Sequence, residues 1–191
     1  MCFLPFSISE THSMSINALS KTLAGALLLC CGALPLATIA ATVPDPVAPR
    51  LSAEEQQVGV ATFTASSYKP GTLRHIVLVR FRDGVSEVQR HSTVEKFMAL
   101  EKQSLRDGKP YIQSIETGPQ TSGEGASHGL QQAFIVTFAS EGDRNYFIGT
   151  PIVSDPQHYE PAHAAFKQIF KPVLAKDDLV SFDFPVTQAV R

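Results

Sequence analysis

One segment near the middle of the chain, residues 73–82, limits the fold more than any other. Its odd-numbered positions carry His75 and four apolar residues, which is the two-residue period of a β-strand. The even-numbered positions include Ile76 and Leu78, which are also apolar. We therefore expect a strand that is buried on both faces at its centre, and such a strand needs neighbours in a sheet and covering layers.

The segments that follow alternate between helix and strand patterns. Asp83 and Gly84 form a turn, and a helix is predicted from Ser86 to about Gly108. Its apolar stripe contains Val94, Phe97, Met98 and Leu105. The remaining predicted elements are strands at 111–117, 130–138 and 180–186 and helices at 141–148 and 161–170, with an inserted loop at 149–159 between the two helices.

This order of elements predicts an α+β fold. The order is β, α, β, β, α, β, with the second helix split by the inserted loop, and it corresponds to the ferredoxin-like split βαβ arrangement. Helices on one face of a four-stranded sheet leave the other face uncovered, and that face still carries apolar residues. Pairing with a second copy would bury it, so we expect a homodimer in which two half-barrels form a dimeric α/β barrel.

The first 41 residues predict export. No charged side chain occurs from Leu23 to Ala41, Lys21 stands before this run, and small residues end it. These are the features of a cleaved signal peptide, so the mature protein is expected to be periplasmic or secreted, with no stable membrane insertion. The alternative is an uncleaved membrane anchor formed by residues 23–41. Residues 42–70 are predicted to be a proline-containing linker, extended as far as Pro49, followed by an N-terminal extension that packs on the domain.

Cysteine positions and charge exclude several classes of protein. The cysteines are Cys2, Cys30 and Cys31, all inside the predicted signal peptide. A mature chain without thiols has no disulfide framework, no Cys nucleophile and no Cys-ligated zinc. The formal net charge of −2 leaves no basic footprint for nucleic acid and no polybasic membrane patch.

Four blocks of the sequence together are similar to a known family. They read LRHIVLVRFRDGVSE, FIVTFASEGDRNYF, PAHAAF and LVSFDF. The chain between Leu73 and Val186 resembles the stress-responsive dimeric A/B barrel family, abbreviated Dabb, which places the domain at residues 71–188. The resemblance implies the same ferredoxin-like half-barrel that pairs into a dimer, in agreement with the pattern of elements.

The resemblance also implies a candidate chemistry. Enzymatic members of the family include polyketide cyclases that need no cofactor and use a His of the Pro-Ala-His segment with an upstream Tyr. The positions that match the family's histidines are His163 in that segment and His75 on the first strand. The family's Tyr position falls on Phe147, so the phenol comes from Tyr146, comes from Tyr159 in the inserted loop, or is missing. Related dimeric barrels include cofactor-free monooxygenases.

The residue pattern adds its own argument for a site. His75 shares a strand face with apolar neighbours, and His163 lies in the first turn of its helix, where the helix dipole favours a neutral imidazole. Two imidazoles directed into one apolar compartment could act as acid and base. The predicted lining of a ligand site is Val77, Val79, Phe97, Phe134, Phe147 and Phe166. The alternative interpretation is that both histidines simply fill the core.

No metal or cofactor is expected. Asp155, His158, Glu160 and His163 have suitable side chains, but their spacing matches no metal motif. Phosphate-binding, dinucleotide and Ser-His-Asp signatures are absent from the sequence.

Three function classes stay open. They are a barrel that binds or converts a small hydrophobic oxygenated molecule, a non-catalytic oligomeric stress protein, and a cofactor-free monooxygenase. A solvent-reached cavity of a few hundred Å³ would favour a ligand, and a filled core would favour the second class.

Overall fold

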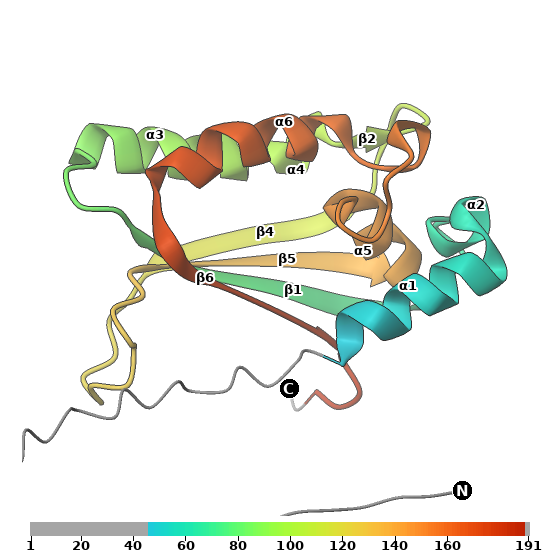
Figure 1. The fold of residues 1–191 in the computed structure, drawn as a ribbon, viewed down its shortest axis with the longest axis horizontal. Helices are drawn as coiled ribbons and strands as arrows, with labels where there is room; N and C mark the ends of the chain where they lie inside the picture. Colours follow the sequence, from blue (N-terminus) through green and yellow to red (C-terminus); the bar gives the residue numbers. More distant parts are fainter. Residues whose placement is uncertain (1–45, 190–191) are drawn as a thin grey trace, which may run out of the picture. The chain divides into compact units, whose positions relative to one another are not determined.

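Strand β1 (Pro70–Phe81) lies inside a four-stranded antiparallel sheet in the computed structural model, which describes residues 46–189 (Figure 1). The sheet order is β4 (Ile112–Pro119), β5 (Gln132–Ser140), β1 and β6 (Leu174–Pro185). Strand β1 pairs with β5 on one side and with β6 on the other. This confirms the predicted central strand, because both of its edges are hydrogen-bonded. The predicted signal peptide, residues 1–41, lies outside the described residues.

Helices α3 (Glu87–Met98), α4 (Leu100–Gln103) and α6 (Pro161–Phe170) cover one face of the sheet (Figure 1). Helix α3 begins after Ser86, whose side chain forms a capping box with Gln89. The predicted continuation of this helix to Gly108 is wrong, because β2 (Leu105–Arg106) turns back on β3 (Lys109–Pro110). Leu105 is consequently 45% exposed and does not belong to the apolar stripe.

The hydrophobic core lies between this helical layer and the sheet. Phe97 of α3 contacts Phe134 of β5 and Phe166 of α6, with ring centroids 4.4 and 5.2 Å apart. The inward-facing residues of β1, Val77 and Val79, are buried in the same cluster. Aromatic packing of this kind fills the space between the layers.

The opposite face of the sheet has no cover among the described residues. Ile76 pairs with Ile135 on β5 and with Phe182 on β6. Phe182 is 61% exposed, and Val180 on the same strand is 44% exposed. Ile76 and Leu78 are therefore only half-buried, and the predicted burial of β1 is complete on its helical face alone.

The second helix of the pattern is split as predicted. Helix α5 (Glu141–Ile148) is capped by Ser140, and the chain then passes through the short helix η1 (Pro156–His158) before α6. After α6, the short helix η2 (Lys171–Val173) leads into β6. Strand β6 begins before the predicted position 180 because its first residues pair with Phe81 and Val79.

The N-terminal extension forms helices α1 (Val47–Val58) and α2 (Val60–Phe63). The expectation of an extended chain as far as Pro49 is therefore wrong from Val47 onward, and residues 42–45 lie outside the described residues. The side-chain amide of Asn145 on α5 donates to the carbonyl of Phe63 at 2.8 Å, and Phe63 is buried. Gly142 lies so close to the carbonyl of Ala65 that a Cβ at position 142 would meet that oxygen at 1.8 Å. The extension thus packs on α5 at Gly142 and Asn145.

No helix within residues 46–189 combines the length and the apolar character needed to cross a membrane. The apolar run at 23–41 lies outside this range.

Candidate functional site

His75 on β1 begins a chain of polar contacts that leads out of the core. It faces Asp183 across the β1–β6 pairing, and its Nδ1 lies 2.6 Å from Oδ1 of Asp183. The other carboxylate oxygen of Asp183 accepts a hydrogen bond from Nη1 of Arg144 at 2.5 Å. Arg144 then donates through Nε to the side chain of Asn145 at 2.9 Å. The described structure thus links an imidazole, a carboxylate and a guanidinium from three elements.

The electrostatics of this chain keep Asp183 ionised. Burial by itself raises the pKa of the Asp183 carboxyl, since a charge is poorly solvated there. The hydrogen bonds from His75 and Arg144 and the positive charge of Arg144 outweigh that effect and lower the pKa below its usual value. Asp183 is therefore a carboxylate at neutral pH and acts as an acceptor for both partners.

His163 lies deeper in the core than the sequence indicates. It is in the first turn of α6 as predicted, it is 7% exposed, and its Nδ1 donates to the carbonyl of Phe147 at 2.7 Å. Its ring stacks on the ring of Phe147, with centroids 4.0 Å apart and planes 11° from parallel. Burial lowers the pKa of His163 to about 3, so the imidazole is neutral. The sequence predicts a neutral imidazole because of the helix dipole, whereas the main cause in the structure is the desolvation of the buried His163 ring.

Phe147 brings the two histidines to one place. His163 stacks on its face, and His75 meets the same ring edge-on, with centroids 6.2 Å apart. The structure therefore directs both imidazoles to a shared apolar compartment, as the pattern of residues predicts. The side chain of Phe147 itself occupies that compartment.

Tyr146 lies in a different cluster. Its ring is 4.1 Å from the guanidinium carbon of Arg106 and 5.5 Å from the ring of Tyr111. Tyr111 donates to the buried carboxylate of Glu160 at 2.9 Å, and the other oxygen of Glu160 caps helix α6. The printed sequence places Tyr146 next to Phe147, but consecutive residues of a helix point in different directions, and only Phe147 contacts His163.

The six predicted ligand-lining residues are all core residues. Each is less than 8% exposed, and together with other side chains they form one hydrophobic cluster: Val77, Val79, Phe97, Phe134, Phe147 and Phe166. None of them lines the apolar pocket beside Arg144 and Asp183. The compartment between the sheet and helices α3 and α6 is thus filled by aromatic rings.

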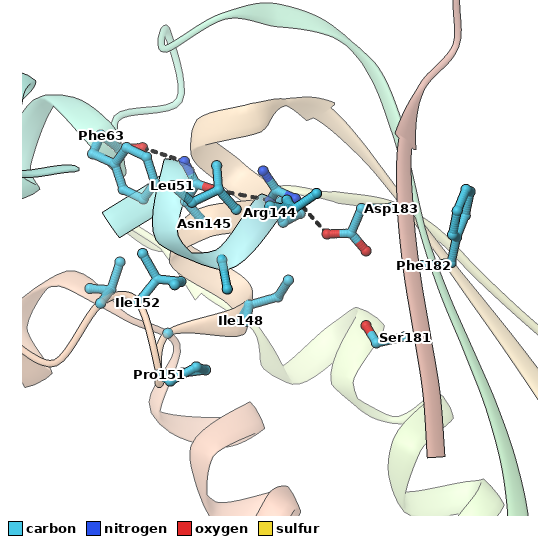
Figure 2. Close-up of a pocket in the computed structure, with 14 residues that line it drawn as sticks. Leu51, Phe63, Arg144, Asn145, Ile148, Pro151, Ile152, Ser181, Phe182 and Asp183 are labelled. Carbon is cyan, nitrogen blue, oxygen red and sulfur yellow. Dashed lines mark hydrogen bonds and ion pairs between the residues drawn. The ribbon is translucent and has the colours of Figure 1, made fainter. Parts of the chain in front are cut away.

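An apolar pocket of about 370 Å³ lies beside this core, between α1, α5, the inserted loop and β6 (Figure 2). Its polar wall contains Arg144 and Asp183, whose side chains point toward one another. Its apolar wall includes Ala48, Leu51, Phe63, Ile148, Ile152 and Val153. The Arg144–Asp183 pair therefore connects this pocket with the buried imidazole of His75.

Arg144, Asp183 and helix α1 are not among the site residues that the sequence predicts. A signal for Asp183 was present, because Ser181 and Asp183 are polar residues alternating with apolar ones on a strand. Arg144 gave no such signal, since a charged residue on a short helix is usually exposed. Ile152 and Val153 of the inserted loop also line this pocket.

Among residues 46–189, no three His, Cys, Asp or Glu side chains are grouped as a metal site would need. His158 lies 4.0 Å from Asp155, whereas Glu160 and His163 are occupied by Tyr111 and Phe147 respectively.

Comparison with known proteins identifies the fold family. The sequence pattern named Stress responsive A/B Barrel Domain matches residues 73–186. No curated protein matches the chain. A hydroxynitrile lyase from Passiflora edulis is similar in structure, with 19% identity, a TM-score of 0.50 and coverage of 64% of this chain and 99% of that one.

Two further solved structures are similar at lower scores. A crystal structure of an Arabidopsis thaliana protein has 22% identity and a TM-score of 0.48, covering 62% of this chain and 99% of that chain. A protein of unknown function from Jannaschia sp. CCS1, described as dimeric and ferredoxin-like, has 15% identity and a TM-score of 0.49, covering 61% of this chain and 100% of that chain.

The family match covers more than half of the chain and spans the sheet, its helical layer and the polar chain from His75 to Asp183. From its sequence and from its ferredoxin-like α+β fold, this chain belongs to the stress-responsive A/B barrel (Dabb) domain family.

Proposed function

We propose that this domain binds a small, mainly hydrophobic molecule that carries one hydroxyl or carbonyl group. The observation that supports this most directly is the position of Arg144 and Asp183 in the wall of an otherwise apolar pocket. A volume of about 370 Å³ is within the range of sites for small organic ligands.

The polar wall suits a neutral oxygen function. The guanidinium of Arg144 can donate a hydrogen bond, and the carboxylate of Asp183 can accept one, so a ligand hydroxyl can use both. The pair carries one positive and one negative charge, and the surrounding surface is apolar. A charged ligand group would add an uncompensated charge to this surface, which is costly.

The same wall offers acid–base chemistry. Asp183 faces the pocket, and His75 is hydrogen-bonded behind it, so a proton released by a bound molecule could be taken up at this pair. The imidazole of His163 is neutral, but its lowered pKa of about 3 makes it a weak base, its Nδ1 is held by Phe147, and it does not line the pocket. We therefore propose Asp183 and His75, rather than His163, for proton uptake. We propose binding as the function and conversion without a cofactor as its extension.

A fluorescence titration tests the binding proposal. The chain has no Trp, so the emission of 2-naphthol can be followed without a tryptophan background. We expect saturable binding of 2-naphthol, and naphthalene, which lacks the hydroxyl, should bind about tenfold more weakly. Equal affinities for the two compounds would show that the polar wall takes no part.

Substitution of Asp183 provides the matched protein control. Asp183→Asn keeps the shape of the side chain and removes its charge, so 2-naphthol should lose affinity while naphthalene does not. Asp178→Asn on the same strand removes the partner of Arg80, an ion pair outside the pocket, and should change neither.

A second candidate function is that of an oligomeric stress protein without catalysis. The filled core around His163 and Phe147 favours it, since no ligand is needed to explain these side chains. The open face of the sheet, with exposed Val180 and Phe182, supports a homodimer in either case. Light scattering should give about twice the mass of the chain, and a stable monomer at micromolar concentration would contradict the dimer.

We also propose that the protein is exported through cleavage near Ala41, on the basis of the uncharged run from Leu23. N-terminal sequencing of the protein from the producing cell tests this. An uncleaved chain in the cytoplasm would overturn it.

A further inference from the structure

We infer that helix α1 of the N-terminal extension, which lies outside the matched family domain, forms a wall of the ligand pocket and sets the size of molecule that fits. This rests on the proposed binding function. The matched domain begins at residue 73, whereas Ala48 and Leu51 of α1 line the pocket.

The exposure of the residues of α1 is the pattern expected of a helix that covers a ligand. None of its residues is buried, so the helix contributes nothing to the main core. Its apolar residues Ala48 and Leu51 instead line the pocket, together with Ile148 of α5 and Ile152 of the inserted loop. A ligand between these side chains would bury the apolar surface that Ala48 and Leu51 expose in the pocket, which favours binding.

The position of α1 is fixed at its other end. The carboxylate of Glu54 accepts hydrogen bonds from the Tyr68 hydroxyl and from the Lys69 ammonium group, and Lys69 also lies 3.5 Å from Glu141 on α5. After α1 the chain turns at Gly59, whose φ of +81° favours glycine, and Phe63 then anchors α2 in the core. The wall is therefore held at a defined distance from α5.

The residues on this wall determine how much space remains. Ala48 is small, and a larger side chain at that position would extend into the pocket between α1 and the loop. Since α1 has no buried residue, such a change alters the pocket without disturbing the core. Leu51 is larger, and its truncation would enlarge the same space.

The test uses the full chain and 2-naphthol as the probe. Ala48→Phe should raise the Kd for 2-naphthol about tenfold or more, because the added ring occupies volume that the ligand uses. Leu51→Ala should shift the preference toward a larger probe, 2-anthrol, relative to 2-naphthol. Gln56→Ala, an exposed position of α1 outside the pocket, is the matched control and should bind both probes as the wild type does.

Circular dichroism of each variant shows whether the fold is kept, and Leu51→Ala supplies a second readout if Ala48→Phe fails to fold. Wild-type affinity in Ala48→Phe, together with unchanged probe preference in Leu51→Ala, would overturn the role of α1 and leave the binding function in place. If the wild type binds neither probe saturably, the proposed function fails, and the role of α1 fails with it.

Discussion

The buried imidazole of His163 makes a quantitative prediction about stability and pH. Its pKa in the folded protein is about 3, whereas a histidine in the unfolded chain titrates near its ordinary value of 6.5. Below pH 6.5 the unfolded chain therefore binds a proton that the folded protein does not bind. Acidification favours unfolding, so the stability that is fully present above pH 6.5 is lost progressively as the pH falls toward 3.

The size of the stability loss depends on how far the pH falls below 6.5, the pKa of histidine in the unfolded chain. Each pH unit within it is worth about 1.4 kcal/mol, so lowering the pH from 7 to 5 should cost about 2 kcal/mol of unfolding free energy from this residue alone. The carboxyl groups with lowered pKa, Asp183 and Glu54, contribute only below about pH 4.5. They therefore contribute little to the change in stability between pH 7 and 5.

Urea unfolding followed by circular dichroism at pH 7, 6 and 5 measures this loss. His163→Asn is the matched variant, because the amide nitrogen of Asn can still donate to the carbonyl of Phe147 but does not titrate. Its stability will be lower at every pH, since the stacking on Phe147 is lost. The loss between pH 7 and 5 should be smaller than in the wild type by about 2 kcal/mol. Parallel curves for the two proteins would refute the assignment of a buried, neutral His163.

Three further changes test other parts of the structure. Gly142→Ala should destabilise the protein by about 1–3 kcal/mol in urea unfolding, because its Cβ would meet the carbonyl of Ala65, whereas Gly123→Ala has open space and should have little effect. Val180→Lys should convert the proposed dimer to a monomer in light scattering; an unchanged dimer would place the interface elsewhere. Ile152→Ala should weaken 2-naphthol binding severalfold, and wild-type affinity would exclude the inserted loop from the site.

The alternation of side chains carried most of the information about the fold. A period of two residues around His75 located the central strand, and Pro161 located the start of α6, because these signals depend on local geometry. The end of the first helix was placed too late at Gly108. The helical segment ends at Gln103, and a hairpin follows from Leu105 to Pro110. The pairing of its two strands depends on contacts that the spacing of apolar residues does not reveal.

The candidate site was less predictable for a physical reason. The direction of His75 and His163 follows from strand and helix periods, and both do face Phe147. Whether an apolar compartment is empty or filled depends on how side chains from several elements fit together, and sequence spacing does not contain that volume. The predicted compartment is filled by aromatic rings, and the open pocket lies at Arg144, where α1 and α5 meet β6.

Determination of a crystal structure of the full chain with 2-naphthol tests the central claim most directly. We predict that the naphthalene rings lie between α1 and α5, with the hydroxyl within hydrogen-bonding distance of Arg144 or Asp183. Rings on the open face of the sheet near Val180 and Leu78, with the pocket beside Arg144 left empty, would contradict the account.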